Sequence, residues 1–167
     1  DREVLQAALD VTVRRFPSIA VRLRRGTFWY YLEELSNAPK IRDEKAYPLA
    51  YVPFKEVREC AFRVIVYKKR IAVEFFHALT DGNGALTFVK TLVAEYITQK
   101  YGVEIPNEDG VLCRLEAPSD EELEDSFLKF SGDVRASRSE KTAYHLSGTT
   151  EENGFVDIVT LMLSADD

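Results

Sequence analysis

The stretch "CAFRVIVYKKRIAVEFFHALTDGNGALTFVKTLVAEYITQKYG", residues 60–102, decides the fold. Residues alternate between apolar and polar over 62–67 and again over 71–77, and the basic residues between them predict the turn of a β-hairpin. After the glycines the spacing becomes that of a helix with Gly102 as its stop, and one face carries apolar residues: Leu86, Val89, Val93 and Tyr96. The stretch therefore predicts a hairpin followed by a helix over 84–101.

The rest of the sequence adds strands and helices on both sides. Residues 2–15 have apolar residues at helical spacing and stop before Pro17, so they predict a first helix. Residues 19–24 alternate, and after Gly26 comes an aromatic run, so two paired strands are expected. Further on we expect a long connection over 36–59, a helix start at "SDEE" (119–122), and two late strands over 142–148 and 154–164. This order predicts an α+β fold, a two-layer sandwich of helices packed on a mixed, mostly antiparallel sheet.

Composition limits the class of protein. The chain of 167 residues is 46% hydrophobic and 30% charged, which is typical of a globular protein, and we expect residues 1–167 to form a single domain. Its net charge of −6 argues against nucleic acid as a partner. No apolar run reaches the roughly 20 residues of a membrane span. Cys60 and Cys113 lack zinc-site spacing, so we expect no metal, free thiols and a cytoplasmic location.

His77 and Asp81 are the candidate functional residues at the junction of hairpin and helix. The alternation places His77 at a strand end, on the face of Ile71, Val73 and Phe75. A neutral imidazole there, with a carboxylate four residues on, suits a general base. The same residues also fit an ordinary turn in which Asp81 caps the helix, and both interpretations stay open. The stretch lacks the further oxygen ligands of a calcium loop and the lysine of a phosphate-binding loop.

The segment His77-Ala-Leu-Thr-Asp81-Gly82 resembles the HxxxDG motif of one acyltransferase superfamily. That superfamily includes chloramphenicol acetyltransferase, peptide-synthetase condensation domains and alcohol acetyltransferases. The stretch "LQAALDVTVRRFPSIAVRL" is similar to its first helix, turn and strand, and "GTFWYYLEE" is similar to its alcohol-acetyltransferase-like bacterial branch. The resemblance covers residues 3–101. Because these enzymes have two similar halves with a tunnel between them, the resemblance implies that the chain is the N-terminal half.

The resemblance also implies a role for each residue of the motif. His77 would be the general base that takes a proton from an alcohol or amine as this acceptor attacks an acyl thioester. Asp81, with Gly82, would be structural and would pair with an arginine, for which Arg22 is the candidate in this chain. Acyl-CoA, acetyl-CoA first, would be a co-substrate, with a carrier-protein thioester as the other possible donor and no bound cofactor. The partners implied are this donor, a small acceptor and the second half of the enzyme.

The ends of the chain add one expectation. Ser164 with an acid three residues on predicts a helix start at the last residues, and the chain begins with Asp1 in place of a methionine. We therefore expect a fragment that folds, is inactive alone, and self-associates through the apolar face left open.

Two alternatives to an enzyme remain. One is a non-catalytic half-domain that serves as a binding or scaffold module. The other is an unrelated α+β domain in which residues 77–84 form only a turn. In that second case we expect the aromatic cluster 28–31 to be part of the core rather than exposed surface.

Overall fold

The structure is a computed structural model of the chain, and it describes residues 1–45 and 52–124 together with Lys129 and Gly148. The chain divides into two compact units, Asp1–Glu124 and Asp125–Asp167. The first unit contains residues 60–102 and therefore the HxxxDG-like segment. Apart from Gly148, two expected features lie outside the described residues: the late strands over 142–148, a range that contains His145, and over 154–164, and the helix start at Ser164.

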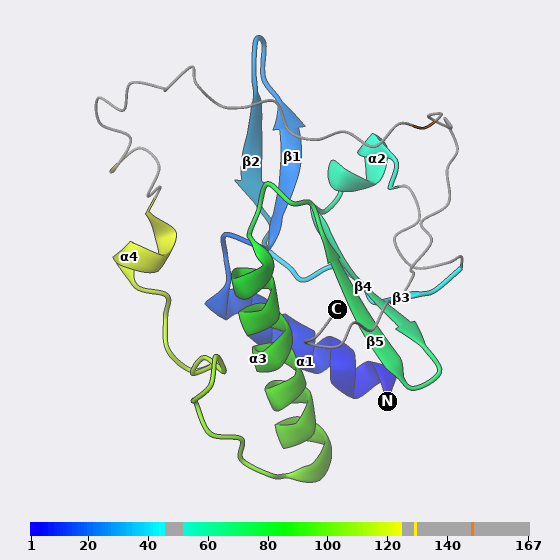
Figure 1. Cartoon of the computed structure of the whole chain (residues 1–167), viewed down its shortest axis with the longest axis vertical. Helices are drawn as coiled ribbons and strands as arrows, with labels where there is room; N and C mark the ends of the chain where they lie inside the picture. The colour runs from blue at the N-terminus through cyan, green and yellow to red at the C-terminus, as the bar shows by residue number, and fades with distance from the viewer. Residues whose placement is uncertain (46–51, 125–128, 130–147, 149–167) are drawn as a thin grey trace, which may run out of the picture. The chain divides into compact units, whose positions relative to one another are not determined.

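Two long helices form where they were expected, the second beginning two residues earlier than predicted (Figure 1). Helix α1, Arg2–Arg15, begins after Asp1, whose carboxylate accepts hydrogen bonds from two amides of the first turn at 3.1 and 3.2 Å. Helix α3, Gly82–Tyr101, ends at Gly102, which has a φ of 68° in the left-handed region that favours glycine. The two helices pack against each other. Within the described residues, no helix combines the length and the apolar character that crossing a bilayer requires.

The buried face of α1 matches the prediction, but that of α3 does not. In α1 the predicted stripe is buried at Leu5, Ala8, Leu9, Thr12 and Val13. In α3 the buried side chains are Phe88, Thr91, Leu92 and Ala94, whereas Leu86 of the predicted stripe is exposed. The helix is rotated because Phe88, its largest apolar side chain, meets three other aromatic rings in the core.

Within residues 1–45 and 52–124, the strands form two small open sheets. The first pairs β1, Val21–Arg25, antiparallel with β2, Tyr30–Glu34. The second has the order β3–β4–β5, with β3 at Arg42–Asp43, β4 at Phe62–Tyr67 and β5 at Arg70–Phe75. In it, β3 runs parallel to β4, and β4 pairs antiparallel with β5. Helices with mixed and antiparallel sheets confirm the α+β class, with two sheets where one was expected.

Ala61 connects the two sheets. Its amide donates to the carbonyl of Val21 in β1, and its carbonyl accepts from the amide of Phe76 just after β5, both at 2.8 Å. One residue thus links the end of the β4–β5 hairpin to the neighbouring β1–β2 hairpin.

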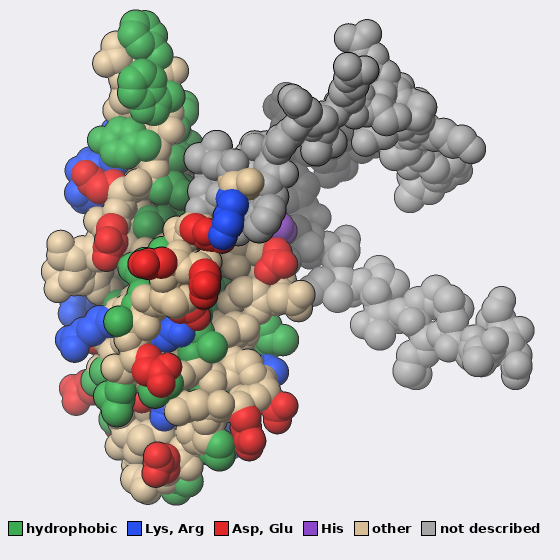
Figure 2. Space-filling view, turned by 90° about the vertical axis from the view of Figure 1, so that its left-hand side faces the viewer, with side chains coloured by type: hydrophobic (Ala, Val, Ile, Leu, Met, Phe, Trp, Pro, Cys, Tyr) green, Lys and Arg blue, Asp and Glu red, His purple; other side chains and the backbone are tan. Residues whose placement is uncertain are grey.

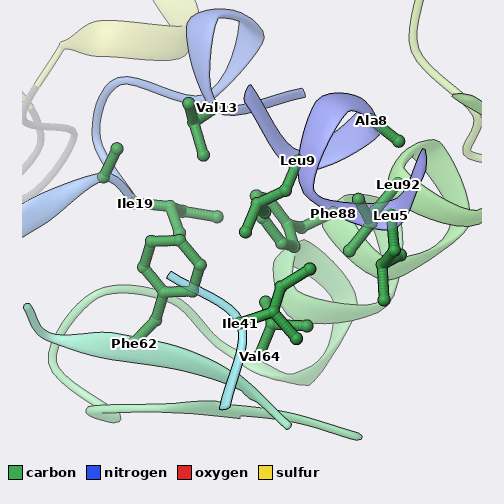
Figure 3. Packing of buried hydrophobic residues seen from close by; sticks show 11 residues of the cluster. Leu5, Ala8, Leu9, Val13, Ile19, Ile41, Phe62, Val64, Phe88 and Leu92 are labelled. Carbon is green, nitrogen blue, oxygen red and sulfur yellow. The ribbon is translucent and has the colours of Figure 1, made fainter. Parts of the chain in front are cut away.

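The hydrophobic core lies between the two long helices and the β4–β5 hairpin (Figure 3). Figure 3 shows side chains of α1 and α3 meeting Phe62 and Val64 of β4 and Ile41 from the segment before β3. The predicted apolar face of the hairpin packs here, since Val66, Ile71, Val73 and Phe75 are partly buried against the cluster. The buried members are Leu5, Ala8, Leu9, Val13, Ile19, Ala20, Ile41, Phe62, Val64, Phe88 and Leu92.

The described residues also include two short helices, one within the long connection expected over 36–59 and one at the helix start expected at Ser119. Helix α2, Phe54–Val57, and strand β3 occupy the connection over 36–59. Helix α4, Asp120–Leu123, begins at Ser119, where the capping box predicted by "SDEE" forms. The chain between α3 and α4 is fixed to α3, because the amide of Leu112 donates to the hydroxyl of Thr91 at 3.1 Å.

A partly buried ion pair joins α4 to the end of α1. Both terminal nitrogens of Arg15 donate to the carboxylate of Glu122, at 2.7 and 2.8 Å. The Arg15 side chain is only 8% exposed, and its Nε is buried without a hydrogen-bond partner among the described residues. The hydrogen bonds from Arg15 lower the pKa of Glu122, and the same contact raises the pKa of Arg15.

Candidate functional site

His77 lies in a tight turn directly after β5. The strand ends at Phe75, and the amide of Leu79 donates to the carbonyl of Phe76 at 2.9 Å, which closes the turn. The prediction placed His77 on the strand itself, in line with Phe75. The structure corrects this: the last pairing of β5 is at Phe75, so His77 stands beyond the ladder with an exposed side chain.

Asp81 begins helix α3. Its carboxylate Oδ1 accepts a hydrogen bond from the amide of Gly84 at 2.8 Å, and its backbone has the extended conformation usual for a helix cap. The first amides of a helix have no carbonyl partner within the helix, and this hydrogen bond provides a partner for one of them. The expected contact between Asp81 and the start of the helix is therefore present.

Gly82, the last residue of the motif, and Gly84, two residues further on, have different surroundings. A Cβ atom on Gly84 would lie 2.1 Å from the hydroxyl of Thr80, so a side chain there requires the threonine to move. A Cβ atom on Gly82 would meet nothing within 4 Å. Gly84 is thus the position where packing against the turn favours glycine.

Arg22 does not pair with Asp81. It forms an ion pair with Glu33, and Arg24 donates to the same carboxylate at 2.9 Å. The antiparallel register explains this, because it places Arg22 directly opposite Glu33. The hydrogen bonds from Arg24 and then Arg22 hold the pKa of Glu33 below its usual value. Among the described residues, no arginine bonds Asp81, so its predicted arginine partner is absent from this part of the chain.

A cavity of about 370 Å³ opens beside His77. Apart from Arg42, its walls come from residues 52–63 and from the end of β5, and a hollow formed by the packing of these segments has no local pattern in the sequence. The lining consists of Arg42, Val52, Phe54, Glu56, Val57, Cys60, Ala61, Phe62, Arg63, Glu74, Phe75, Phe76 and His77.

The charged groups of this cavity neutralise one another. Arg42 pairs with Glu56 at 2.6 Å, Arg63 approaches the same carboxylate at 3.4 Å, and Arg63 also pairs with Glu74. Burial raises the pKa of the Cys60 thiol on the wall. Because a thiolate is the nucleophilic form, this thiol is a poor nucleophile at neutral pH.

The aromatic cluster of the β1–β2 hairpin is exposed, which contradicts the core placement expected under the alternative of an unrelated α+β domain. Phe28 is 89% exposed and Trp29 63% exposed. Figure 2 shows hydrophobic side chains gathered at the upper end of the molecule, over the tip of this hairpin. In the described residues β2 pairs only with β1, in a two-stranded sheet, and every position of β2 is exposed or half-buried. The hairpin tip therefore extends away from the core. One ring is partly covered, since Tyr30 meets Phe54 edge to face with centroids 5.8 Å apart.

Comparison with known proteins yields structural likenesses but no family or curated match. No protein-family model matches the chain, and no curated protein does. Among solved structures, the SgcC5 protein from Streptomyces globisporus is similar, with 21% sequence identity and a TM-score of 0.47. The matched region covers 64% of this chain and 29% of that protein, so the chain corresponds to less than a third of its length.

Proposed function

We propose that the chain carries the general base of an acyltransferase site, which moves an acyl group, acetyl first, from a CoA or carrier-protein thioester to an alcohol or amine. One observation supports it most. His77 is exposed in the turn after β5, whereas Asp81, four residues on, is occupied by an amide of α3. An exposed imidazole and a carboxylate bonded to the backbone thus lie within one short segment, as the resemblance to the HxxxDG motif implies. General-base catalysis needs such an imidazole within reach of the acceptor proton.

The chemistry requires only proton transfer from the protein. A ring nitrogen of neutral His77 accepts the proton of the acceptor O–H or N–H while the acceptor oxygen or nitrogen bonds to the thioester carbonyl carbon. The carbon–sulfur bond then breaks, and the imidazolium returns the proton to the sulfur, which releases a free thiol. Assistance of this kind accelerates a reaction by about 10²–10⁴-fold. Asp81 takes no part in the transfer and holds the turn at the start of α3.

The proposal includes a second wall for the site. The imidazole of His77 is exposed, and water weakens the electrostatic interactions that a dry site strengthens. We therefore propose that a second protein surface, similar to the second half of the resembled enzymes, covers His77 during turnover. We also propose a cytoplasmic reaction, because Cys60 and Cys113 are free thiols in the structure.

The test compares the two histidines of the chain. In the natural full-length protein, thiol release from acetyl-CoA is measured against a panel of alcohols and amines. His77→Ala should lower turnover by about 10²-fold or more while circular dichroism stays unchanged. His145→Ala is the matched control and should keep most of the activity. Near-normal turnover of a folded His77→Ala protein would contradict the proposal.

One observation favours the alternative of a non-catalytic binding module. The exposed rings of Phe28 and Trp29 form an apolar surface of the kind that contacts partners. This alternative predicts that no acceptor in the panel releases thiol from acetyl-CoA, and that changing Trp29 to Ser alters association without altering any turnover.

A further inference from the structure

We propose that the cavity beside His77 is the subsite for an uncharged apolar group of the substrate whose reactive atom meets the imidazole. The proposal rests on the proposed function and adds the class of substrate to it: an acyl chain or acceptor body of small to medium size, without charge.

The first argument is the shape and lining of the cavity. Its volume of about 370 Å³ lies at the small end of ligand pockets, which span roughly 300–1,000 Å³. Phe62 and Phe75 on its wall are stacked, with ring centroids 6.0 Å apart and planes inclined by 20°. Phe54 and Val57 of α2 contribute apolar surface as well. Such a space suits one ring or a short alkyl chain rather than a nucleotide.

The second argument is the charge of the lining. Each arginine of the cavity already pairs with glutamate, as Arg42 does with Glu56 and Arg63 with Glu74. A carboxylate or phosphate entering the cavity would have to compete with these glutamates, above all in the Arg63–Glu74 pair, whose side chains are only 19% and 16% exposed, and breaking such a partly buried pair is destabilising. An uncharged group leaves them intact.

The third argument is the position of the polar group. His77 is exposed, whereas the apolar lining residues Cys60, Ala61 and Phe62 are partly or fully buried. A substrate whose reactive atom meets the imidazole can therefore extend its apolar part inward. Both the acyl donor and the acceptor carry such a part, so the experiment has one arm for each.

Cys60 provides a reporter that does not depend on catalysis. It lies on the cavity wall, whereas the other free cysteine, Cys113, is not part of this lining. In a Cys113→Ser background, alkylation by N-ethylmaleimide reports only on Cys60. The reaction is followed in mildly alkaline buffer, because burial raises the pKa of this thiol and the thiolate is the form that reacts.

The experiment measures protection of Cys60 by two homologous series, linear alcohols from ethanol to hexanol and S-acyl pantetheines from acetyl to hexanoyl. The proposal expects one series to slow alkylation by about tenfold once roughly nine-tenths of the protein is occupied. The concentration for half protection should fall by about fourfold for each added methylene until the cavity is full. The series that protects identifies the acceptor or the donor as the source.

Two controls complete the design. Val57→Phe fills the cavity from α2 and should remove the protection, whereas Val103→Phe changes an exposed valine just beyond α3 and should not. If Val57→Phe fails to fold, the two series on the unfilled protein still decide the question. Equal alkylation rates with and without both series would overturn the proposal, and so would protection by hexanoate as strong as that by hexanol.

The outcomes separate this inference from the proposed function. Protection together with a fully active His77→Ala protein refutes His77 as the general base and with it the substrate placement inferred here, and leaves an apolar cavity of another purpose. Loss of activity in His77→Ala without any protection supports the acyltransferase and refutes the subsite.

Discussion

Replacing Phe88 by alanine is expected to cost about 3–5 kcal/mol of unfolding free energy, because a large buried side chain leaves a cavity. The side chain is 0% exposed. Its ring meets those of Phe16, Phe62 and Phe75 edge to face, with centroids 5.2, 5.5 and 5.6 Å away. Each such pair contributes roughly 0.5–1.5 kcal/mol beyond the burial of area. Phe88→Leu keeps most of the apolar volume and loses mainly these contacts, so about 1.5–3 kcal/mol is expected for it.

The assay is urea denaturation followed by far-ultraviolet circular dichroism. Leu86→Ala is the matched control, since Leu86 is exposed on the same helix and its loss should change stability by no more than about 0.5 kcal/mol. Similar losses for Phe88→Ala and Leu86→Ala would refute the packing described for α3. A Phe88→Leu variant as stable as the parent would refute the part assigned to the ring contacts.

Three further changes test the helix caps and the ion pair between α1 and α4, each by chemical denaturation. Asp81→Ala should cost about 1 kcal/mol and Asp81→Asn clearly less, because Asn can still accept the amide hydrogen bond; equal losses would contradict the cap. Gly102→Ala should cost about 1 kcal/mol, because it forces a side chain into the left-handed region at φ 68°, and an unchanged midpoint would count against this conformation. Glu122→Gln leaves the buried Arg15 without an anionic partner and should cost about 1–3 kcal/mol at neutral pH, near the low end because Glu122 is 40% exposed, while Glu121→Gln should cost little. Because pairing lowers the folded-state pKa of Glu122 from 4.5, its contribution is complete above pH 4.5 and is lost as the pH falls through the folded-state value; a Glu122→Gln difference that does not shrink in acid would contradict the pairing.

Periodicity in the sequence was sufficient for the parts of the fold held by local pattern. The presence and order of α1, the β4–β5 hairpin and α3 follow from spacing and stop signals, with the end of β5 and the start of α3 each differing by two residues, and the cap of α4 follows from "SDEE". The rotation of α3 could not be read in this way, because it depends on which helix face meets the aromatic rings of distant segments. Strand β3 has only two residues and is defined by its pairing with β4, so no local sequence pattern predicts it.

The candidate site was predicted only as far as local geometry determines it. The cap formed by Asp81 depends on residues up to Gly84 and could be predicted. The partner of Arg22 depends on the strand register, which the turn after Gly26 sets, and this register places Glu33 opposite. The ion pair between Arg15 and Glu122 joins residues 107 positions apart, and nothing near either residue indicates it.

The exposed hairpin tip also determines how this protein can be observed. Trp29 is the only tryptophan in the sequence, and its side chain is in contact with water in the folded chain. Unfolding therefore changes the surroundings of the indole little. We expect tryptophan emission to change only slightly when the core around Phe88 is lost. The same placement makes the indole a sensitive reporter of the opposite event: any surface that covers the hairpin will shift its emission to shorter wavelength.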